Sequence, residues 1–301
     1  MSWSNLPNDI YWEQRSQHFI DEAVKDATVL SQQYADLYKA LGKQMETEAR
    51  ALIQKYGLDK KEWYKQADGS TIQGLNQAFD KLIADGVPYD EAVQIRNGLA
   101  KVSRLEALIK QFDVLATETA NSLNKDLYDL MASTYQKVFT ELGIDLGELT
   151  LSHVIDVRQL VEAVTYNWSG EMFSDRIWAN KDAMIEQLRQ EMLLQISKGS
   201  NVNKLAEKFA HIMGVGHYNA HRLIHTELCA MVNKATVDRY LQSDVVVGHR
   251  FMAYLDNRTS KVCRGLDGQE FYYDKEEPII GTNVPPMHPN CRSCIVPIVK
   301  L

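Results

Sequence analysis

The sequence predicts an α+β protein that is mostly helical, with long amphipathic N-terminal helices and a small C-terminal β-rich subdomain. Two observations predict this class. Five of the seven prolines lie after residue 277, so the long stretch before them largely lacks the residue that interrupts helices. From Val245 onward, the apolar residues change from helical spacing to β-branched and aromatic runs.

Residues 1–150 are expected to form a helical N-terminal domain with two long helices. Apolar residues recur every three or four positions from Leu30 to Tyr56 and from Leu105 to Leu130, which places each set on one helix face. Gly57 is a suitable stop for the first helix, and the second is expected to end toward Gly143 and Gly147. The intervening segment carries several glycines and a proline, which predicts shorter helices there.

A second helical block is expected over residues 151–244. In chain order we expect a helix from Val154 to Val164, a loop with a short helical turn from Trp168 to Asn180, a helix from Met184 to Gly199, a helix broken at Gly214 and Gly216, and a last helix from about Asn219 to Leu241.

Residues 245–301 are expected to form the β-rich subdomain, packed with residues 218–244. Its expected elements are a strand in VVVGHRFMAYLD, a turn at DNRTS, a tight turn at Asp267-Gly268, a strand in QEFYYD and an edge strand in CIVPIV.

Composition narrows the possible functions. Hydrophobic residues make up 45% and charged residues 24%, which is ordinary for a globular protein and excludes a disordered tail, a collagen and a disulfide scaffold. The formal net charge of −7 makes genomic DNA a weak or indirect partner at most, because phosphate binding needs clustered Lys and Arg. No secretory signal and no apolar run of membrane-spanning length is evident, so we expect a protein made in the cytosol with no membrane partner.

The C-terminal cysteines and one histidine form the strongest local signal. His288, Cys291 and Cys294 form a His-x-x-Cys-x-x-Cys motif, and Cys263 lies upstream near a turn. This Cys₃His set suits tetrahedral zinc, which would stabilise a subdomain with little core. The alternative is a buried thiol cluster without metal, in which His288 caps a turn.

Two further interpretations of the Cys and His residues are weaker. Cys263 and His288 could be a nucleophile and its base, oriented by Asp256 or Asn290, but there is no local nucleophile signature. Four histidines lie close together in one predicted helical region. No carboxylate is placed to complete a metal site with them, so we interpret them as a solvated or core-edge stripe. Its members are His211, His217, His221 and His225.

Polar residues mark the helix and the turn that precede this His-Cys motif. Arg222 and Thr226 share a helix face next to Glu227, and the turn contains Asp256, Arg258 and Thr259. Such a cluster is either an architectural ion-pair network or an active site. We interpret it as a structural network, because ion pairs commonly imitate functional sites.

These residues occur in an order that resembles the phage minor head (head morphogenesis) protein family, typified by protein F of phage Mu. The segments that carry the resemblance are RLIHTE (222–227), DNRTS (256–260), CRGLDG (263–268) and PPMHPNCRS (285–293). Segments outside this region, YWEQR (11–15), WSG (168–170) and FSDRIW (173–178), are similar to longer members from phages of Gram-positive bacteria.

The resemblance implies a virion component of low copy number and no settled catalytic activity. We therefore expect a non-enzymatic minor head protein of a tailed phage or prophage, located at the portal vertex inside the capsid and in the bacterial host cytoplasm during assembly. Its implied partners are the portal protein and the scaffolding or major capsid protein, with roles in procapsid assembly and DNA packaging or delivery. The alternatives are a cytosolic Cys-His hydrolase and a zinc-dependent adaptor unrelated to virions.

Carrying the family pattern over residue by residue gives a structural network and a smaller metal set. The matching residues are Arg222, Thr226, Glu227, Asp256, Arg258, Thr259, Cys263, Asp267, Gly268, His288, Cys291 and Arg292. Members often have a second Cys directly after the residue matching Arg292, whereas this chain has Ser293 and then Cys294. The departure makes Cys263, His288 and Cys291 the firmer ligands.

Overall fold

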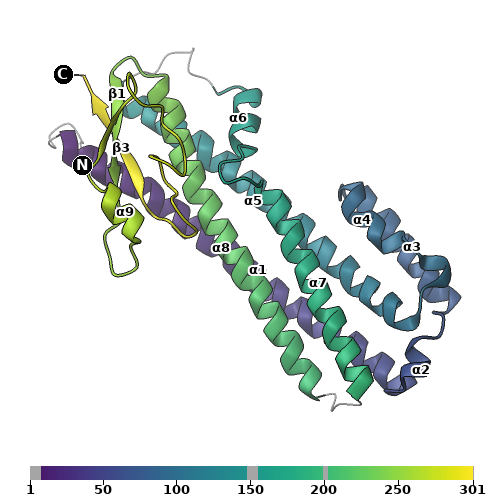
Figure 1. Ribbon diagram of the computed structural model, residues 1–301. Helices are drawn as coiled ribbons and strands as arrows, with labels where there is room; N and C mark the ends of the chain where they lie inside the picture. The colour runs from purple at the N-terminus through teal and green to yellow at the C-terminus, as the bar shows by residue number, and fades with distance from the viewer. Residues whose placement is uncertain (1–7, 148–154, 199–202, 301) are drawn as a thin grey trace. The chain divides into compact units, whose positions relative to one another are not determined.

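A computed structural model describes residues 8–147, 155–198 and 203–300. The helices are α1 (Asn8–Tyr56), α2 (Lys60–Trp63), α3 (Gly69–Ala84), α4 (Tyr89–Arg96), α5 (Arg104–Asp145), α6 (Val157–Val164), α7 (Phe173–Lys198), α8 (Asn203–Leu241) and α9 (Lys261–Leu266), with a 3₁₀ turn η2 at Leu99–Lys101. The strands are β1 (Val246–Met252), β2 (Glu270–Tyr272) and β3 (Cys294–Val299). The predicted class, mostly helical α+β, is confirmed (Figure 1).

The chain forms two compact units that interleave along the sequence. The sheet unit comprises Met1–Leu30, Asp126–Phe173 and His221–Leu301, and the helical unit comprises Ser31–Lys125 and Ser174–Ala220. This division differs from the expected boundaries after residues 150 and 244. Each of the helices α1, α5 and α8 contributes one part to each unit, which a division into consecutive segments does not capture.

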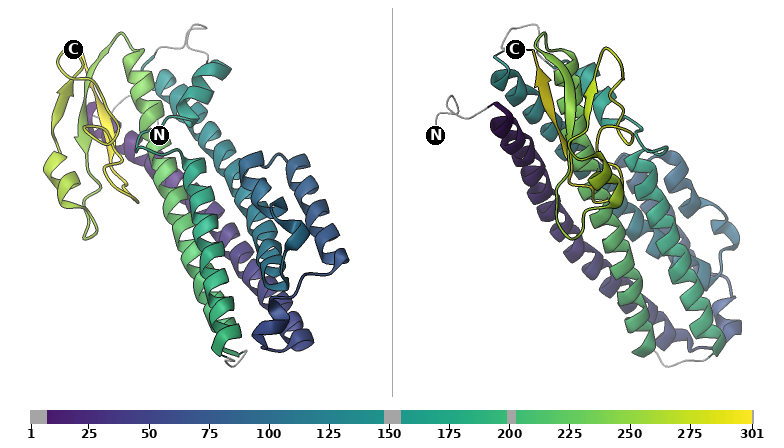
Figure 2. Two further views of the ribbon diagram at one scale, coloured as in Figure 1. Left: turned by 45° about the vertical axis from the view of Figure 1, so that its right-hand side comes forward. Right: turned by 60° about the vertical axis from the view of Figure 1, so that its left-hand side comes forward.

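Apolar faces pack the helical unit together. Its portions of α1, α5, α7 and α8 lie side by side (Figures 1 and 2). The buried rings of Phe112 on α5 and Phe209 on α8 meet edge to face, with centroids 5.7 Å apart. Lys181 on α7 is buried, and its Nζ lies 3.3 Å from Oδ1 of Asp113 on α5. Burial of such a cation is tolerated because carboxylates accompany it.

The sheet unit contains a three-stranded antiparallel sheet of order β2-β1-β3. Gly248 of β1 pairs with Tyr272 of β2, and a Cβ added at Gly248 would overlap the carbonyl oxygen of Phe271. The close approach of the two strands therefore requires glycine here. Pro297 lies in β3, at the sheet edge as predicted.

Two sequence predictions about helices were wrong. Residues 168–180 are not a loop up to Asn180, because α7 begins at Phe173 and buries Phe173, Ile177 and Trp178. Helix α8 continues through Gly214 and Gly216 to Leu241 instead of breaking. The expected helix start at Val154 lies outside the described residues. The C-terminal ends at Tyr56 and Leu241 are confirmed.

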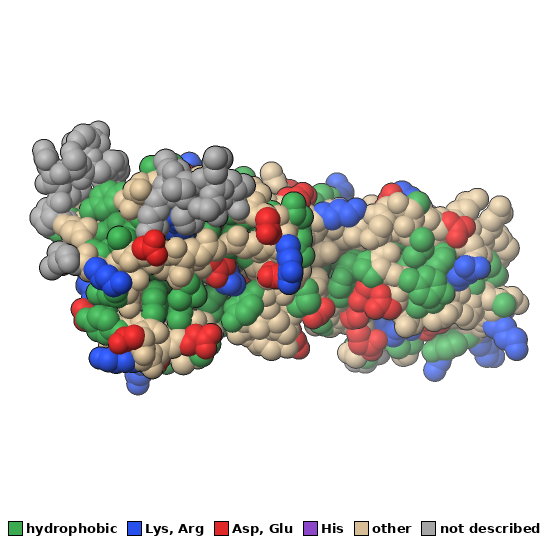
Figure 3. Space-filling view, turned by 90° about the horizontal axis from the view of Figure 1, so that it is seen from above, with side chains coloured by type: hydrophobic (Ala, Val, Ile, Leu, Met, Phe, Trp, Pro, Cys, Tyr) green, Lys and Arg blue, Asp and Glu red, His purple; other side chains and the backbone are tan. Residues whose placement is uncertain are grey.

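The surface carries both signs of charge. On the face in Figure 3, Asp and Glu side chains are interspersed with Lys and Arg. Within the ranges that the structure describes, no helix has the length and apolar character needed to cross a membrane.

Candidate functional site

Helix α8 holds the segment of residues 287–293, here called the knuckle, at two points two helical turns apart. The Thr226 hydroxyl accepts a hydrogen bond from the backbone N–H of Asn290 (2.9 Å) and donates to the carbonyl of Arg222 (2.6 Å). Seven residues later, Asn233 Nδ2 donates to the carbonyl of Ser293 (3.2 Å). Residues seven apart share a helix face, so α8 serves as a rigid support for the knuckle.

Helix α9 brings Cys263 to the knuckle. Ser260 caps this helix by accepting from the N–H of Cys263 (3.1 Å), and the Asp267 carboxylate accepts from the N–H of Ala253 (2.9 Å) after β1. Gly268 follows with φ +76°, a conformation that glycine adopts without strain, and its N–H donates to Phe251. The predicted Asp-Gly turn therefore folds α9 back against the end of β1.

Three of the four predicted metal ligands converge. Cys263 Sγ lies 3.4 Å from His288 Nε2 and 3.7 Å from Cys291 Sγ, and the ligand atoms of the three residues all lie within 4.8 Å of one another. Both cysteines are 1% exposed, and His288 is partly exposed. In the described part of the chain, this is the one group of three or more His, Cys or acidic residues arranged in this way.

Cys294 lies outside this group. It is a buried residue in β3, where it pairs with Met252 of β1. Burial raises its pKa, as burial also raises the pKa of Cys229 on α8 to about 12. Both thiols are therefore protonated at neutral pH.

The Cys263 thiol has the opposite electrostatic environment. A hydrogen bond from Cys291 lowers the pKa of Cys263 to about 5, although burial opposes the shift. The pKa of Cys291 is raised, first because of that same bond to Cys263. The shared hydrogen bond therefore favours ionisation of Cys263 over ionisation of Cys291.

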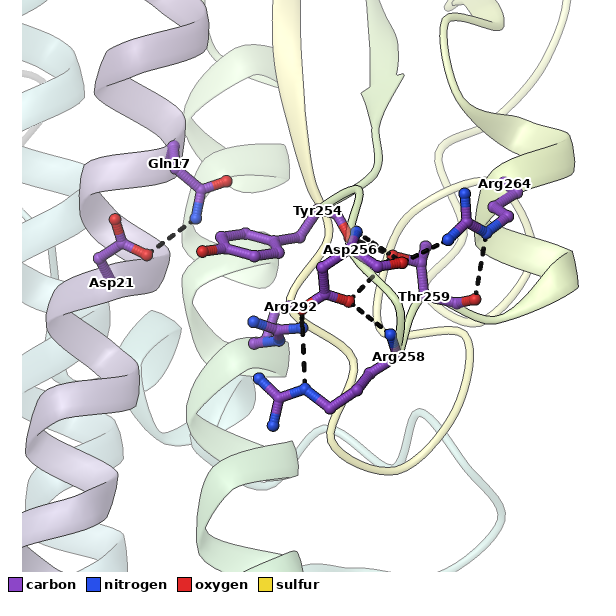
Figure 4. A network of polar contacts seen from close by, with 8 residues as sticks. All are labelled: Gln17, Asp21, Tyr254, Asp256, Arg258, Thr259, Arg264 and Arg292. Atoms are coloured by element: carbon purple, nitrogen blue, oxygen red, sulfur yellow. Dashed lines mark hydrogen bonds and ion pairs between the residues drawn. The ribbon is translucent and has the colours of Figure 1, made fainter.

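The Asp256 turn forms a polar network beside the knuckle (Figure 4). Arg292 donates to Asp256 Oδ2 (2.5 Å), and its guanidinium lies 4.1 Å from the centre of the Tyr254 ring. Thr259 donates to the carbonyl of Tyr254 (2.6 Å) and accepts from the N–H of Asp256 (2.7 Å). The hydrogen bond from Arg292 is the main reason that the pKa of Asp256 falls to about 2.

The other residues of the predicted polar cluster lie in different places. The Arg258 side chain is exposed, and its Nε lies 3.6 Å from Oδ2 of Asp256. Its backbone N–H donates a hydrogen bond to the same carboxylate. Glu227 is buried and accepts from the indole N–H of Trp168 (3.0 Å). Arg222 is exposed on α8, and its backbone carbonyl accepts the hydrogen bond from the Thr226 hydroxyl. The helix and the knuckle are thus joined by neutral hydrogen bonds.

In the part of the chain that the structure describes, the histidines of α8 belong to no group of potential metal ligands. His221 and His225 stack with ring centroids 4.3 Å apart, and burial lowers the pKa of His225 to about 4. His211 is exposed.

The sequence did not identify Asn233 as a site residue, and it suggested Asn290 only as a side chain that could orient a Cys-His pair. Asn233 lies seven residues after Thr226, a spacing that identifies a shared helix face. Asn290 has φ +60°, a left-handed conformation in which asparagine is enriched. Its backbone, rather than its side chain, makes the contact with α8.

The family comparison covers the elements that build this site. Residues 186–296 match the family model described as phage Mu protein F like protein. The resemblance seen in the motifs is confirmed for this segment. The Mu F-like domain runs from α7 to β3 and includes the knuckle and the Asp256 turn, and it indicates a protein of phage head morphogenesis. No curated protein and no solved structure matches the chain.

Proposed function

We propose that this chain is a minor head protein of a tailed phage or prophage, associated with the portal vertex on the capsid interior. It takes part in procapsid assembly in the host cytoplasm and in DNA packaging or delivery. The match of residues 186–296 to the phage Mu protein F like family carries the proposal. The portal protein is the principal partner, with scaffolding or major capsid protein as further contacts.

The charge distribution supports a protein partner over direct DNA binding. The net charge is −7, and acidic and basic side chains are interspersed on the face in Figure 3. Binding along a duplex needs a cluster of cations that displaces counterions from the phosphates. The chain is therefore suited to a place near packaged DNA without adhering along it.

Mass spectrometry of purified virions and procapsids tests this function. The chain should be present at low copy beside the portal protein, and antibody against the portal should co-precipitate it from procapsid lysates. Absence from both particles, with normal expression in the host, would reject the proposal.

A Cys-His hydrolase is the second candidate, because Cys263 Sγ and His288 Nε2 are 3.4 Å apart and the Cys263 pKa is low. Three observations oppose a hydrolase. Cys263 is 1% exposed, Asp256 is bound to Arg292, and His288 Nδ1 faces the Pro289 carbonyl instead of an orienting side chain. A thiol-directed activity probe that labels Cys263, with labelling lost in His288→Ala, would favour the hydrolase.

A further inference from the structure

The two separations measured from Cys263 are those of ligands around one ion, and all three ligand atoms lie within 4.8 Å of one another. In a tetrahedral zinc site with Zn–S of about 2.3 Å and Zn–N of about 2.0 Å, neighbouring sulfurs lie about 3.8 Å apart and sulfur and nitrogen about 3.5 Å apart. The observed distances from Cys263 Sγ are 3.7 Å to Cys291 Sγ and 3.4 Å to His288 Nε2. A disulfide would place the sulfurs at about 2.05 Å.

The orientation of His288 provides an independent observation. Its Nδ1 lies 2.9 Å from the carbonyl oxygen of Pro289, an acceptor that requires the ring proton to be on Nδ1. The lone pair is then on Nε2, the nitrogen that faces Cys263. Metal-binding histidines are commonly held in this way, by donating the other ring N–H to a carbonyl or carboxylate.

The surroundings keep the three ligands in place. Cys263 and Cys291 pack with buried Phe251 and Ala253, and with Leu266, Phe271 and Met287 at the margin. The hydrogen bonds from Asn290 to Thr226 and from Asn233 to Ser293 fix the backbone on both sides of Cys291. The ligand positions are therefore set by the fold before any ion binds.

We propose that Cys263, His288 and Cys291 bind one zinc ion, with a water molecule as the fourth ligand. Two thiolates and an imidazole are the donors that zinc prefers, whereas magnesium and calcium prefer oxygen. Cys294 is not a ligand, because it lies in β3 outside the group. The ion links α9 to the knuckle, and this role does not depend on the proposed place in the virion.

Elemental analysis of the full chain, purified without a histidine tag, tests the site and its ligands. We expect about one zinc per chain in the native protein, and less than about 0.2 in Cys263→Ser, Cys291→Ser and His288→Ala. Cys294→Ser and Cys229→Ser are the matched controls, because both remove a buried thiol outside the group and should retain the metal. Zinc retained in Cys263→Ser, or lost only in Cys294→Ser, would overturn the assignment.

Measurements on the unsubstituted protein avoid variants that fail to fold. Chelation should increase amide hydrogen exchange at residues 261–266 and 287–293, and adding zinc should reverse the increase. Cobalt added to the chelated protein should give a thiolate charge-transfer band. Zinc below about 0.2 per chain before and after metal addition, with exchange unchanged by chelator, would reject the site and leave a metal-free thiol cluster. If the chain were also detected in virions, this result would reject the zinc site and leave the proposed function standing.

Discussion

The Thr226 hydroxyl makes two hydrogen bonds, one within α8 and one to the knuckle. We expect Thr226→Val to remove the protein partner of the Asn290 N–H at a partly buried position, at a cost of about 1 kcal/mol in the free energy of unfolding. Urea denaturation measures this change.

The control for that substitution is Thr28→Val on α1. Thr28 makes the same bond to a carbonyl four residues earlier but is exposed and has no described second contact through its hydroxyl. Its effect should lie within about 0.5 kcal/mol of zero. Equal effects of the two substitutions would show that the contact with Asn290 contributes nothing.

His249 is expected to make stability depend on pH. It lies fully buried in β1, its Nε2 is 3.1 Å from the Asn283 carbonyl oxygen, and its ring stacks on Phe271. Burial lowers its pKa from 6.5 to about 4. The unfolded chain therefore binds a proton more readily, so stability is complete above about pH 6.5 and falls toward pH 4.

Between pH 7 and pH 5, this one histidine should reduce the free energy of unfolding by about 2 kcal/mol. His249→Gln should remove that part of the pH dependence, as measured by urea midpoints at both pH values. His18→Gln is the control, since His18 is half exposed. Unchanged pH dependence in His249→Gln would contradict the assignment.

At the level of elements, α8 shows how packing overrides local preference. Gly214 and Gly216 each disfavour a helix by about 1 kcal/mol relative to alanine, yet the helix passes through both. A Cβ at Gly216 would lie 2.8 Å from Cε1 of Tyr38, whereas a Cβ at Gly214 would meet no atom within 4 Å. Only Gly216 is needed for close contact with α1.

We therefore expect opposite effects from two substitutions in one helix. Gly214→Ala should raise the free energy of unfolding by about 0.5–1 kcal/mol through helix propensity. Gly216→Ala should lower it, because displacing the buried Tyr38 ring costs roughly 1–3 kcal/mol and exceeds the gain in propensity. Stabilisation by both would show that Tyr38 shifts without cost.

For the whole molecule, the proposed virion role requires a surface that contacts other head proteins. Leu255 and Val262 flank the Asp256 turn within the Mu F-like domain and are 58% and 55% exposed. Apolar side chains exposed around a structured turn are suited to a protein interface.

We expect the double substitution Leu255→Ser, Val262→Ser to fold normally and to reduce incorporation into procapsids several-fold, as measured by quantitative mass spectrometry. Ile10→Ser, Val29→Ser is the control, since both residues are exposed apolar positions of α1 outside the family match. Equal incorporation of both variants would place the contact surface elsewhere.

The sequence by itself determined the fold class, the C-terminal ends of α1 and α8, the place of strand β1 and the turn at Asp267-Gly268. These features depend on local periodicity and on backbone conformations that few residues adopt, so a single chain segment contains the information. The motif spacing also selected Cys263, His288, Cys291 and Cys294 together, and the resemblance to the family made the first three the firmer ligands. Zinc binding by them stays a prediction.

Tertiary structure alone decided the interleaved units, the start of α7 at Phe173 and the continuity of α8 through its glycines. It also placed Cys294 in β3, outside the ligand group, and supplied the Thr226 and Asn233 contacts that hold the knuckle. All of these depend on contacts between residues far apart in the chain. Burial of an apolar face or a backbone hydrogen bond outweighs local preferences of about 1 kcal/mol per residue, and no window of sequence contains both partners.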